Sequence, residues 1–379
     1  MSKVDTYDCA FIGGGLAGLT AAINLAKSGY RILLFEKESY PFHKVCGEYI
    51  SMESWDYLVR LGLPLSDMQL PRIKKLLVTA PIGITLEQDL PLGGFGISRY
   101  LLDETLMHLA KKNGVIIMNP ARVESVAFDG KQFTINSTAG VFTCTCCCGS
   151  YGKRSNLDRI WKRPFILKKP NPLNHFIGVK YHIAGHFNTD QIALHNFSDG
   201  YCGLSKIEGD RYCLCYLTTA ENLKRSGNSI EKMEREILSK NPHLEKIISE
   251  RQSFYEQPIT ISQVSFNKKT QVENHVLMLG DAAGLIAPLS GNGMSMAMHS
   301  GKLAVALVEE FLEKKISRVE MEKRYQKQWK QLFAGRLVTG RLIQRVFGKP
   351  TATNIFLWMM KKTPNLSQWL IRQTHGNSF

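Results

Sequence analysis

The chain has 379 residues, of which 44% are hydrophobic and 21% are charged. This composition excludes a disordered chain, and no apolar run is long enough to span a membrane as a helix. The formal net charge is +15, but it is unevenly distributed. Residues 311–379 contain fourteen Lys or Arg and three Glu, a balance of +11. A charge concentrated in this way calls for a specific interpretation of the C-terminal region.

The amino end and the cysteines both point to a reducing compartment. No charged leader, long apolar segment or small-residue cleavage site opens the chain, so we expect a cytoplasmic protein. The nine cysteines are odd in number and match no disulfide framework. Cys144, Cys146, Cys147 and Cys148 lie in a β-like run, where alternate side chains point to opposite faces. Thiols that point to opposite faces cannot by themselves provide the four ligands of a tetrahedral metal site. We therefore predict that these cysteines are buried as small apolar side chains and bind no metal.

The first motif joins a short apolar strand at residues 7–12 to a glycine-rich loop, a helix and a second strand. The glycines have the spacing of the dinucleotide fingerprint, and Glu36 ends the second strand. Such a βαβ unit places a pyrophosphate at the amino end of the helix, and Glu36 can accept hydrogen bonds from an adenosine ribose. The predicted cofactor-binding residues of this motif are Gly13, Gly15, Leu16, Ala17, Gly18, Glu36 and Lys37.

The second motif begins with a buried strand at residues 275–279 and continues into a glycine-rich turn and a long helical pattern. A carboxylate at the end of a strand can bind the ribityl hydroxyls of a flavin, and the glycine-rich turn can face the isoalloxazine ring. A simple NAD dehydrogenase has no use for this motif, so FAD is the predicted cofactor. The predicted contacts are Gly280, Asp281, Pro288, Gly291, Asn292 and Gly293.

With both motifs, the chain resembles the FAD-dependent hydroxylase superfamily, which has the p-hydroxybenzoate hydroxylase fold. The Lys-Val-Cys-Gly element at residues 44–47 is similar to one found in the geranylgeranyl reductase-like branch, and the segment beginning at Ser98 is similar to the one whose arginine contacts FAD. The resemblance covers roughly residues 5–310. It implies that the FAD site also includes Lys44, Cys46, Gly47 and Arg99. Lys44 and Cys46 are the candidate catalytic residues.

One position departs from the family pattern. Most members have an aspartate where this chain has Tyr151, and a tyrosine does not supply that charge. The resemblance therefore leaves the electron donor open between NAD(P)H and a reduced ferredoxin or similar protein. The tryptophan pair of flavin-dependent halogenases and the second GxGxxG of disulfide reductases are both missing from the sequence.

The predicted fold is α/β: a Rossmann-type FAD-binding domain (p-hydroxybenzoate hydroxylase-like) with an inserted antiparallel β substrate domain and a helical C-terminus. Four short runs, at residues 176–184, 191–197, 201–207 and 211–218, predict hairpins of the inserted sheet. The predicted boundaries are 1–75, 95–160 and 265–330 for a discontinuous FAD-binding domain, 76–94 and 161–264 for the substrate-binding sheet, and 331–379 for a basic amphipathic helical region. The aromatic side chains that either line the substrate face or simply pack are Tyr181, His195, Tyr201 and Tyr216.

Residues 331–347 place apolar side chains on one helical stripe, with arginines beside it. Two interpretations remain open. These helices either pack on the flavin domain, or they form a cationic surface that contacts a lipid interface peripherally, at the inner face of the membrane. Nucleic-acid binding is not expected, because no recognition module is apparent.

We therefore expect an FAD-dependent oxidoreductase that acts on a hydrophobic prenyl, long-chain or phenolic lipid. The preferred reaction is reduction of a C=C bond by hydride transfer from flavin N5, with Cys46 either a proton donor or a small buried side chain. One alternative is a monooxygenase that hydroxylates a phenolic substrate through a C4a-hydroperoxide. Another is a non-catalytic or electron-transfer flavoprotein.

Overall fold

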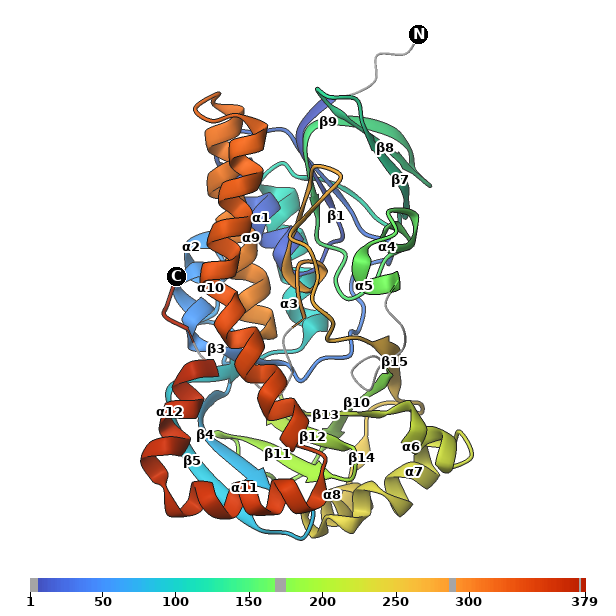
Figure 1. Cartoon of the computed structure of the whole chain (residues 1–379), viewed down its shortest axis with the longest axis vertical. Helices are drawn as coiled ribbons and strands as arrows, with labels where there is room; N and C mark the ends of the chain where they lie inside the picture. The colour runs from blue at the N-terminus through green and yellow to red at the C-terminus, as the bar shows by residue number, and fades with distance from the viewer. Residues whose placement is uncertain (1–5, 168–174, 286–290, 375) are drawn as a thin grey trace.

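The computed structural model describes residues 6–167, 175–285, 291–374 and 376–379. These residues form two β-sheets, one toward each end of the molecule, with helices packed around them (Figure 1). The predicted α/β fold with a second sheet and a helical C-terminus is confirmed. The predicted domain boundaries stay a proposal.

The first sheet has a parallel centre in the order β17-β9-β1-β2-β6. Its strands are β1 (Thr6–Ile12), β2 (Ile32–Phe35), β6 (Ile116–Met118), β7 (Val123–Phe128), β8 (Phe133–Ser137), β9 (Gly140–Gly149), β16 (Val272–Glu273) and β17 (Val276–Met278). The cysteines of β9 are buried, as predicted. Burial raises the pKa of Cys146 and Cys147, which keeps these thiols protonated.

Three helices pack together over this sheet. They are α1 (Leu16–Lys27), α3 (Arg99–Lys112) and α9 (Gly293–Leu312). The middle one, α1, contacts the other two, which brings the start of the chain next to residues near 300. Shorter helices are α2 (Trp55–Leu61), α4 (Asn156–Ile160) and α5 (Pro164–Leu167), with 3-10 turns η1 (Met52–Ser54) and η3 (Gly280–Ala282).

The second sheet has the order β14-β10-β13-β12-β11-β4-β5-β3, with β15 paired to β10. Its strands are β3 (Tyr49–Ser51), β4 (Arg72–Thr79), β5 (Thr85–Gly96), β10 (Phe176–Ala184), β11 (Gln191–Phe197), β12 (Gly200–Lys206), β13 (Tyr212–Thr219), β14 (Gln252–Ser253) and β15 (Ile259–Val264). The strands β10 to β13 match the predicted runs within one residue at each end. Strand β3 pairs in this sheet although it lies in the predicted FAD segment 1–75.

One face of the second sheet is covered by short helices. They are α6 (Ala220–Arg225), α7 (Ile230–Glu236), η2 (Leu238–Lys240) and α8 (Pro242–Glu250). Alternate residues of β10, such as Val179 and Ile183, pack with Met233 and Leu244 of these helices. Because side chains alternate along a strand, their neighbours in β10 point to the opposite face.

The C-terminal region is helical, as predicted, with α10 (Arg318–Val346), α11 (Pro350–Lys362) and α12 (Pro364–Thr374). Helix α10 packs along α9 and runs from the first sheet toward the second, where α11 and α12 contact β5 (Figure 1). Within the described part of the chain, no helix combines the length and the apolar character that crossing a membrane requires.

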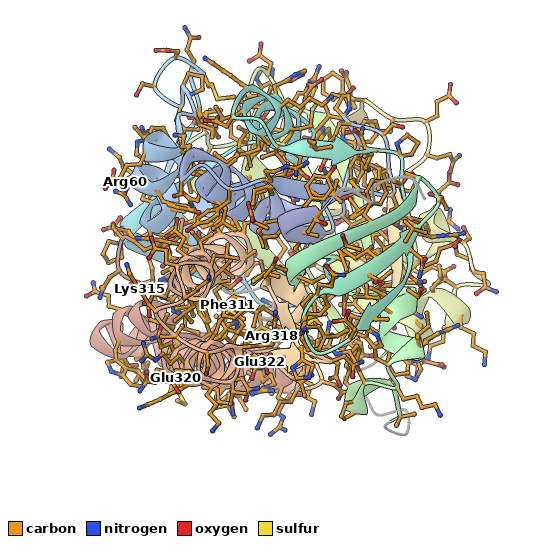
Figure 2. All side chains as sticks on the ribbon, turned by 90° about the horizontal axis from the view of Figure 1, so that it is seen from above. Arg60, Phe311, Lys315, Arg318, Glu320 and Glu322 are labelled. Carbon is orange, nitrogen blue, oxygen red and sulfur yellow. The ribbon has the colours of Figure 1, made fainter. Side chains whose placement is uncertain are left out.

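The turn between α9 and α10 is fixed by an arginine. The guanidinium of Arg318 lies over the rings of Phe128, Phe133 and Phe311 at 4.6, 5.3 and 4.8 Å. Figure 2 shows Phe311, Lys315 and Arg318 around this turn. These contacts attach the β7–β8 hairpin to the helices that carry the C-terminal region.

Candidate cofactor site

The glycine loop after β1 is closely packed on its protein side. Gly13 has φ +110°, and a Cβ there would lie 2.5 Å from the Cα of Tyr151. A Cβ on Gly18 would collide with the carbonyl oxygen of Gly13. Only glycine fits both positions, and the loop therefore presents bare backbone at the amino end of α1.

Gly15 lies on the open side of this loop. The nearest groups to a Cβ built there are the side-chain ends of Arg99 and Lys44, each at 3.8 Å. Both cations bind Asp103: Arg99 Nε and Nη2 donate at 2.8 and 2.7 Å, and Lys44 Nζ donates at 3.0 Å. Burial disfavours the charge of Asp103, but Arg99 and Lys44 hold its pKa below the usual range. Two fixed cations against one carboxylate leave a positive charge beside the helix terminus, which suits a pyrophosphate.

Glu36 lies at the end of β2, next to the loop. Its carboxylate accepts hydrogen bonds from the backbone N–H of Gly14 at 3.0 Å and of Glu38 at 3.1 Å. A carboxylate offers further acceptor sites, so Glu36 can also accept from ribose hydroxyls. Lys37, in contrast, is 68% exposed and pairs with Glu38, away from the loop.

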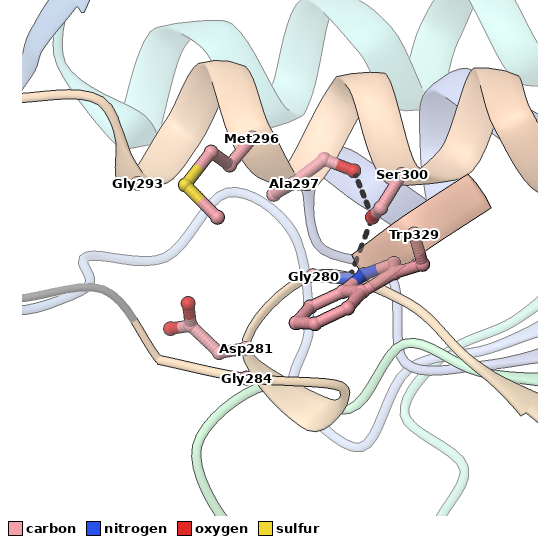
Figure 3. A pocket seen from close by; sticks show the side chains of 8 residues that line it. All are labelled: Gly280, Asp281, Gly284, Gly293, Met296, Ala297, Ser300 and Trp329. Carbon is pink, nitrogen blue, oxygen red and sulfur yellow. Dashed lines mark hydrogen bonds between the residues drawn. The ribbon is translucent and has the colours of Figure 1, made fainter. Parts of the chain in front are cut away.

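A cavity of about 220 Å³ lies between η3 and the start of α9 (Figure 3). It is lined by Gly280, Asp281, Gly284, Gly293, Met296, Ala297, Ser300 and Trp329. The hydroxyl of Ser300 accepts from the N–H of Gly280 at 2.8 Å and donates to the carbonyl of Ala297 at 2.8 Å, which fixes the turn. The cavity brings Asp281 of η3 and Gly293 of α9 onto one lining surface.

Asp281 has the environment of a ligand-binding carboxylate. Burial raises the pKa of its side chain, and the cations of Lys153 and Lys269 oppose this effect. No residue in the described ranges donates a hydrogen bond to its carboxylate oxygens. Because this carboxylate is partly exposed and lines the cavity, its oxygens can accept hydrogen bonds from a ligand, and it fits the ribityl hydroxyls of a flavin.

The glycine-rich turn meets the same cavity. Gly291 has φ +64° and lies against the ring of Tyr49, and Asn292 is the buried N-cap of α9. Gly293 lines the cavity together with Asp281. Pro288, the remaining predicted contact, lies outside the described residues.

The segment at residues 44–47 lies between the cofactor motifs and the second sheet. The thiol of Cys46 is half-buried and lies 3.6 Å from the sulfur of Met294 at the start of α9. A Cβ on Gly47 would have no atom within 4 Å, so this residue borders open space. The backbone carbonyls of the segment accept hydrogen bonds from Lys180 at 3.2 Å, Cys213 at 3.2 Å and Ser205 at 3.0 Å.

Of the four side chains predicted to line or pack the second sheet, three lie on its helix-covered face. Tyr181 lies under the guanidinium of Arg251, and Tyr216 donates to Glu234 at 2.9 Å. His195 bonds Thr79 and stacks on a histidine of α8, and its burial lowers its pKa to about 3. Tyr201 lies in an apolar cluster with Leu357 and Met360 of α11. These are packing positions.

Four polar residues on the other face of this sheet were not among the predicted site residues. They are Lys180, His182, Ser205 and Cys213. Their alternation with Tyr181 and other packing residues was the available signal, because it assigns them to the opposite face.

Tyr151 points into the protein rather than toward the glycine loop. Its hydroxyl donates to Asp158 at 2.8 Å and accepts from Arg163 at 3.1 Å. Arg163 is fully buried and also donates to Asp158 at 2.9 Å. Burial raises the pKa of Tyr151, so its hydroxyl stays neutral. Tyr151 thus anchors the loop between β9 and α4.

Comparisons with known proteins agree with this geometry. A family described as an NAD(P)-binding Rossmann-like domain matches residues 12–62. Conditioned medium factor receptor 1 from Dictyostelium discoideum is 25% identical over 354 residues, which covers 86% of this chain and 68% of the relative. Digeranylgeranylglycerophospholipid reductase 1 from Methanococcoides burtonii is 24% identical over 371 residues, which covers 90% of this chain and 84% of the relative.

Solved structures share the fold across the whole chain. A geranylgeranyl bacteriochlorophyll reductase-like protein from Thermoplasma acidophilum has a TM-score of 0.80 at 18% identity and covers 100% of this chain and 97% of its own. The halogenase PltM in complex with phloroglucinol and FAD has a TM-score of 0.77 at 16% identity and covers 97% and 82%. The predicted likeness to geranylgeranyl reductase-like proteins is confirmed, and the chain has the fold of FAD-dependent oxidoreductases.

Proposed function

We propose that this protein is an FAD-dependent oxidoreductase that reduces a carbon–carbon double bond of a prenyl or other long-chain lipid. The observation that carries the proposal is the position of the residue 44–47 segment, between the predicted cofactor site and the second sheet. The similarity to a digeranylgeranylglycerophospholipid reductase over most of the chain supports this substrate class.

The chain's own residues bind and orient the cofactor in this proposal. Arg99, Lys44 and the amino end of α1 hold the pyrophosphate, Glu36 holds the ribose, and Asp281 holds the ribityl chain. Bound FAD supplies the hydride. Cys46, half-buried beside α9, is the proposed proton donor to the substrate carbon.

The reaction is tested by incubating the FAD-loaded protein, reduced with dithionite, with digeranylgeranyl glycerophospholipid under nitrogen. We expect products that gain about two mass units for each reduced double bond, since a hydride and a proton are added. The same products should form in the presence of oxygen. A product that gains an oxygen atom, and forms only in air, contradicts the proposal and supports hydroxylation.

The role of Cys46 is tested separately. Cys46→Ser should lower turnover at least ~10-fold, because a hydroxyl is a weaker proton donor, while FAD stays bound. Cys202→Ser is the matched control, since this thiol lies on the helix-covered side of the second sheet. Equal turnover of wild type and Cys46→Ser removes the proposed role.

We also propose that a reduced electron-transfer protein supplies the electrons. Tyr151 stands where the resemblance leads us to expect an aspartate, and its side chain is engaged with Asp158 and Arg163. The net charge of +15 favours association with an acidic carrier. Anaerobic stopped-flow measurements should show fast flavin reduction by reduced ferredoxin and slow reduction by NADPH. Fast reduction by NADPH alone contradicts this.

The C-terminal helices support a peripheral membrane contact. They expose apolar side chains that we call the C-terminal surface: Val338, Leu342, Ile355, Trp358, Met359, Leu366 and Trp369. Residues 323–379 contain eleven Lys or Arg and no Asp or Glu. The ammonium of Lys362 lies 4.4 Å from the centre of the Trp358 ring, so charge and apolar surface occur side by side. An anionic bilayer has the matching chemistry, and it is also where a prenyl lipid substrate resides.

A further inference from the structure

A buried group of ionisable side chains lies next to the residue 44–47 segment. Glu48, Lys180 and His182 are each at most 2% exposed. The ammonium of Lys180 lies 2.5 Å from one carboxylate oxygen of Glu48, and Nε2 of His182 lies 2.6 Å from the other. The Glu48 carboxylate also accepts from the backbone N–H of Arg99 at 2.7 Å. The group therefore adjoins both the segment and the arginine that faces Gly15.

This buried group continues to the protein surface. Nδ1 of His182 lies 2.7 Å from the hydroxyl of Tyr255, and the same hydroxyl lies 3.3 Å from the ring nitrogens of His43. Tyr255 and His43 are both partly exposed. At the inner end, Lys180 donates to the carbonyl of Lys44 at 3.2 Å. Consecutive hydrogen-bonding distances thus connect solvent with the cofactor side of the sheet.

A purely structural role does not explain this arrangement. Burying charged groups costs free energy, and a buried ion pair is often no better than packed apolar side chains. A structural pair would need only Glu48 and Lys180. Here His182 uses both ring nitrogens, one toward Glu48 and one toward Tyr255, which is the bonding pattern that passes a proton through an imidazole. Burial, together with Lys180 and His182, lowers the pKa of His43 to about 4, so His43 is neutral at pH 7 and can both accept and donate.

The alternative interpretation of these buried side chains is that they bind a metal ion. One ligand atom each from Glu48, His182 and Cys213 lies within 4.8 Å of the others. The ammonium of Lys180, however, already neutralises Glu48 at 2.5 Å. Despite burial, Lys180 and His182 hold the pKa of Glu48 below its usual range. The side chains therefore balance their own charge without a metal.

We propose that Tyr255, His182 and Glu48 form a proton path from solvent to Lys180, and that this path returns a proton to the site after each turnover. The inference rests on the proposed function, because reducing a double bond consumes one proton together with each hydride. Lys180 donates to the carbonyl of Lys44, and Cys213 of the neighbouring strand donates to the carbonyl of Cys46, so the inner end of the path lies beside the backbone that carries Cys46.

Cys46 gives its thiol proton to the substrate carbon and regains one from Lys180. Glu48 passes a proton to Lys180, and His182 releases one from Nε2 to Glu48 while taking one on Nδ1 from Tyr255. His182 then carries its proton on Nδ1, and its ring must reorient before the next transfer. Tyr255 regains its proton from solvent, directly or through His43. One proton enters for each one consumed, and no electron moves along the path.

Other ionisable groups face the path and belong in any interpretation of its pH dependence. They are Lys44, Arg99, Glu208, Arg211, Cys213 and Cys215.

The path is tested first without turnover. In full-length protein with ¹⁵N-labelled histidine, NMR gives the rate at which the His182 ring proton exchanges with solvent, and His182→Gln assigns its signal. Tyr255→Phe removes one hydroxyl and should slow this exchange about tenfold. Tyr212→Phe is the matched control, because its hydroxyl bonds the carbonyl of Phe187 outside the path. An unchanged exchange rate in Tyr255→Phe overturns the path.

The second measurement links the path to the reaction. With reduced, FAD-loaded protein, Tyr255→Phe should lower kcat about tenfold, leave KM within about twofold and enlarge the solvent isotope effect, while Tyr212→Phe behaves as wild type. If Tyr255→Phe slows the exchange of the His182 ring proton but leaves kcat unchanged, the path does not take part in catalysis. Zinc that copurifies with wild type and is lost in Cys213→Ala also overturns the proposal. If no lipid is reduced by any variant, the proposed function fails, but the exchange measurement still decides the path.

Discussion

Asp103 holds both cations of the predicted pyrophosphate site, since Arg99 and Lys44 donate to its carboxylate. Asp103→Asn should lower the free energy of unfolding by ~3 kcal/mol, because it leaves two cations without their anion in a largely buried site. The same change should weaken FAD binding, since the cations lose their fixed positions. Urea unfolding and flavin fluorescence titration measure the two effects.

Glu104→Gln is the control for this change, because the neighbouring carboxylate is more exposed and lies 4.0 Å from His108 on the surface of α3. Its unfolding and FAD affinity should match wild type. If Asp103→Asn binds FAD as tightly as wild type, the assignment of Arg99 and Lys44 to the pyrophosphate is wrong.

Because Lys269 is buried, we expect the free energy of unfolding to depend on pH. Burial lowers the pKa of Lys269 to about 8, whereas a lysine in an unfolded chain has a pKa of about 10.4. Between these values the unfolded chain binds the proton that the folded chain has released, so stability should rise with pH across this window. Below pH 8 both states are protonated, and no rise is expected.

The measurement compares wild type with Lys269→Met. From pH 8 to pH 10 the unfolding free energy of wild type should rise by about 2 kcal/mol relative to the variant. Lys268→Met changes an exposed neighbour and should keep the rise. A wild-type curve parallel to that of Lys269→Met would show that Lys269 stays protonated in the fold.

At the scale of elements, the loop from β9 to α4 depends on Tyr151. Its hydroxyl bonds Asp158, which also closes the N-terminal capping box of α4 with Ser155. Tyr151→Phe should cost about 1–2 kcal/mol of stability through the lost hydrogen bonds. Tyr151→Asp, which introduces the aspartate that the sequence resemblance led us to expect, should cost more, because it places a second carboxylate beside Asp158.

Thermal unfolding of the two variants checks this order, and anaerobic mixing with NADPH checks the consequence for electron supply. We expect Tyr151→Asp not to accelerate flavin reduction, because its loop loses the contacts that shape it. A stable Tyr151→Asp that is reduced rapidly by NADPH would mean that this single residue excludes the nicotinamide donor.

The local sequence pattern was sufficient to predict the strands of the second sheet, but it did not predict the polar contacts that their side chains make. The four short runs at residues 176–184, 191–197, 201–207 and 211–218 predicted β10 to β13 closely, because β-branched and aromatic residues between turn signals favour strands. These runs did not identify Lys180 and His182, whose partner Glu48 lies 132 and 134 residues away in the chain. A contact of this range depends on which sheet face meets the residue 44–47 segment, and a single sequence does not encode that in any local pattern.

At the scale of the whole molecule, the residue 44–47 segment and helix α10 both connect the region of the first sheet to that of the second. The residue 44–47 segment leads directly into β3 of the second sheet, and its carbonyls are held by β10, β12 and β13. Helix α10 makes another connection, from α9 to the helices beside β5 (Figure 1). A displacement of the second sheet would therefore move Lys44 and Cys46 relative to the glycine loop, which links the proposed substrate region to the cofactor site.

The charge and shape of the C-terminal surface predict binding to anionic membranes. Liposome sedimentation should show binding to vesicles with phosphatidylserine or phosphatidylglycerol and little binding to phosphatidylcholine alone. Because salt at 1 M shortens the screening length to about 3 Å, binding should fall sharply there. Trp358→Ala with Trp369→Ala should lower the partition coefficient at least ~10-fold, because both indoles, 53% and 54% exposed, are removed from the lipid boundary.

Phe254→Ala removes an exposed aromatic at β14 and should have no effect. Equal binding of all variants to neutral and anionic vesicles would instead assign these helices to packing or to a protein partner.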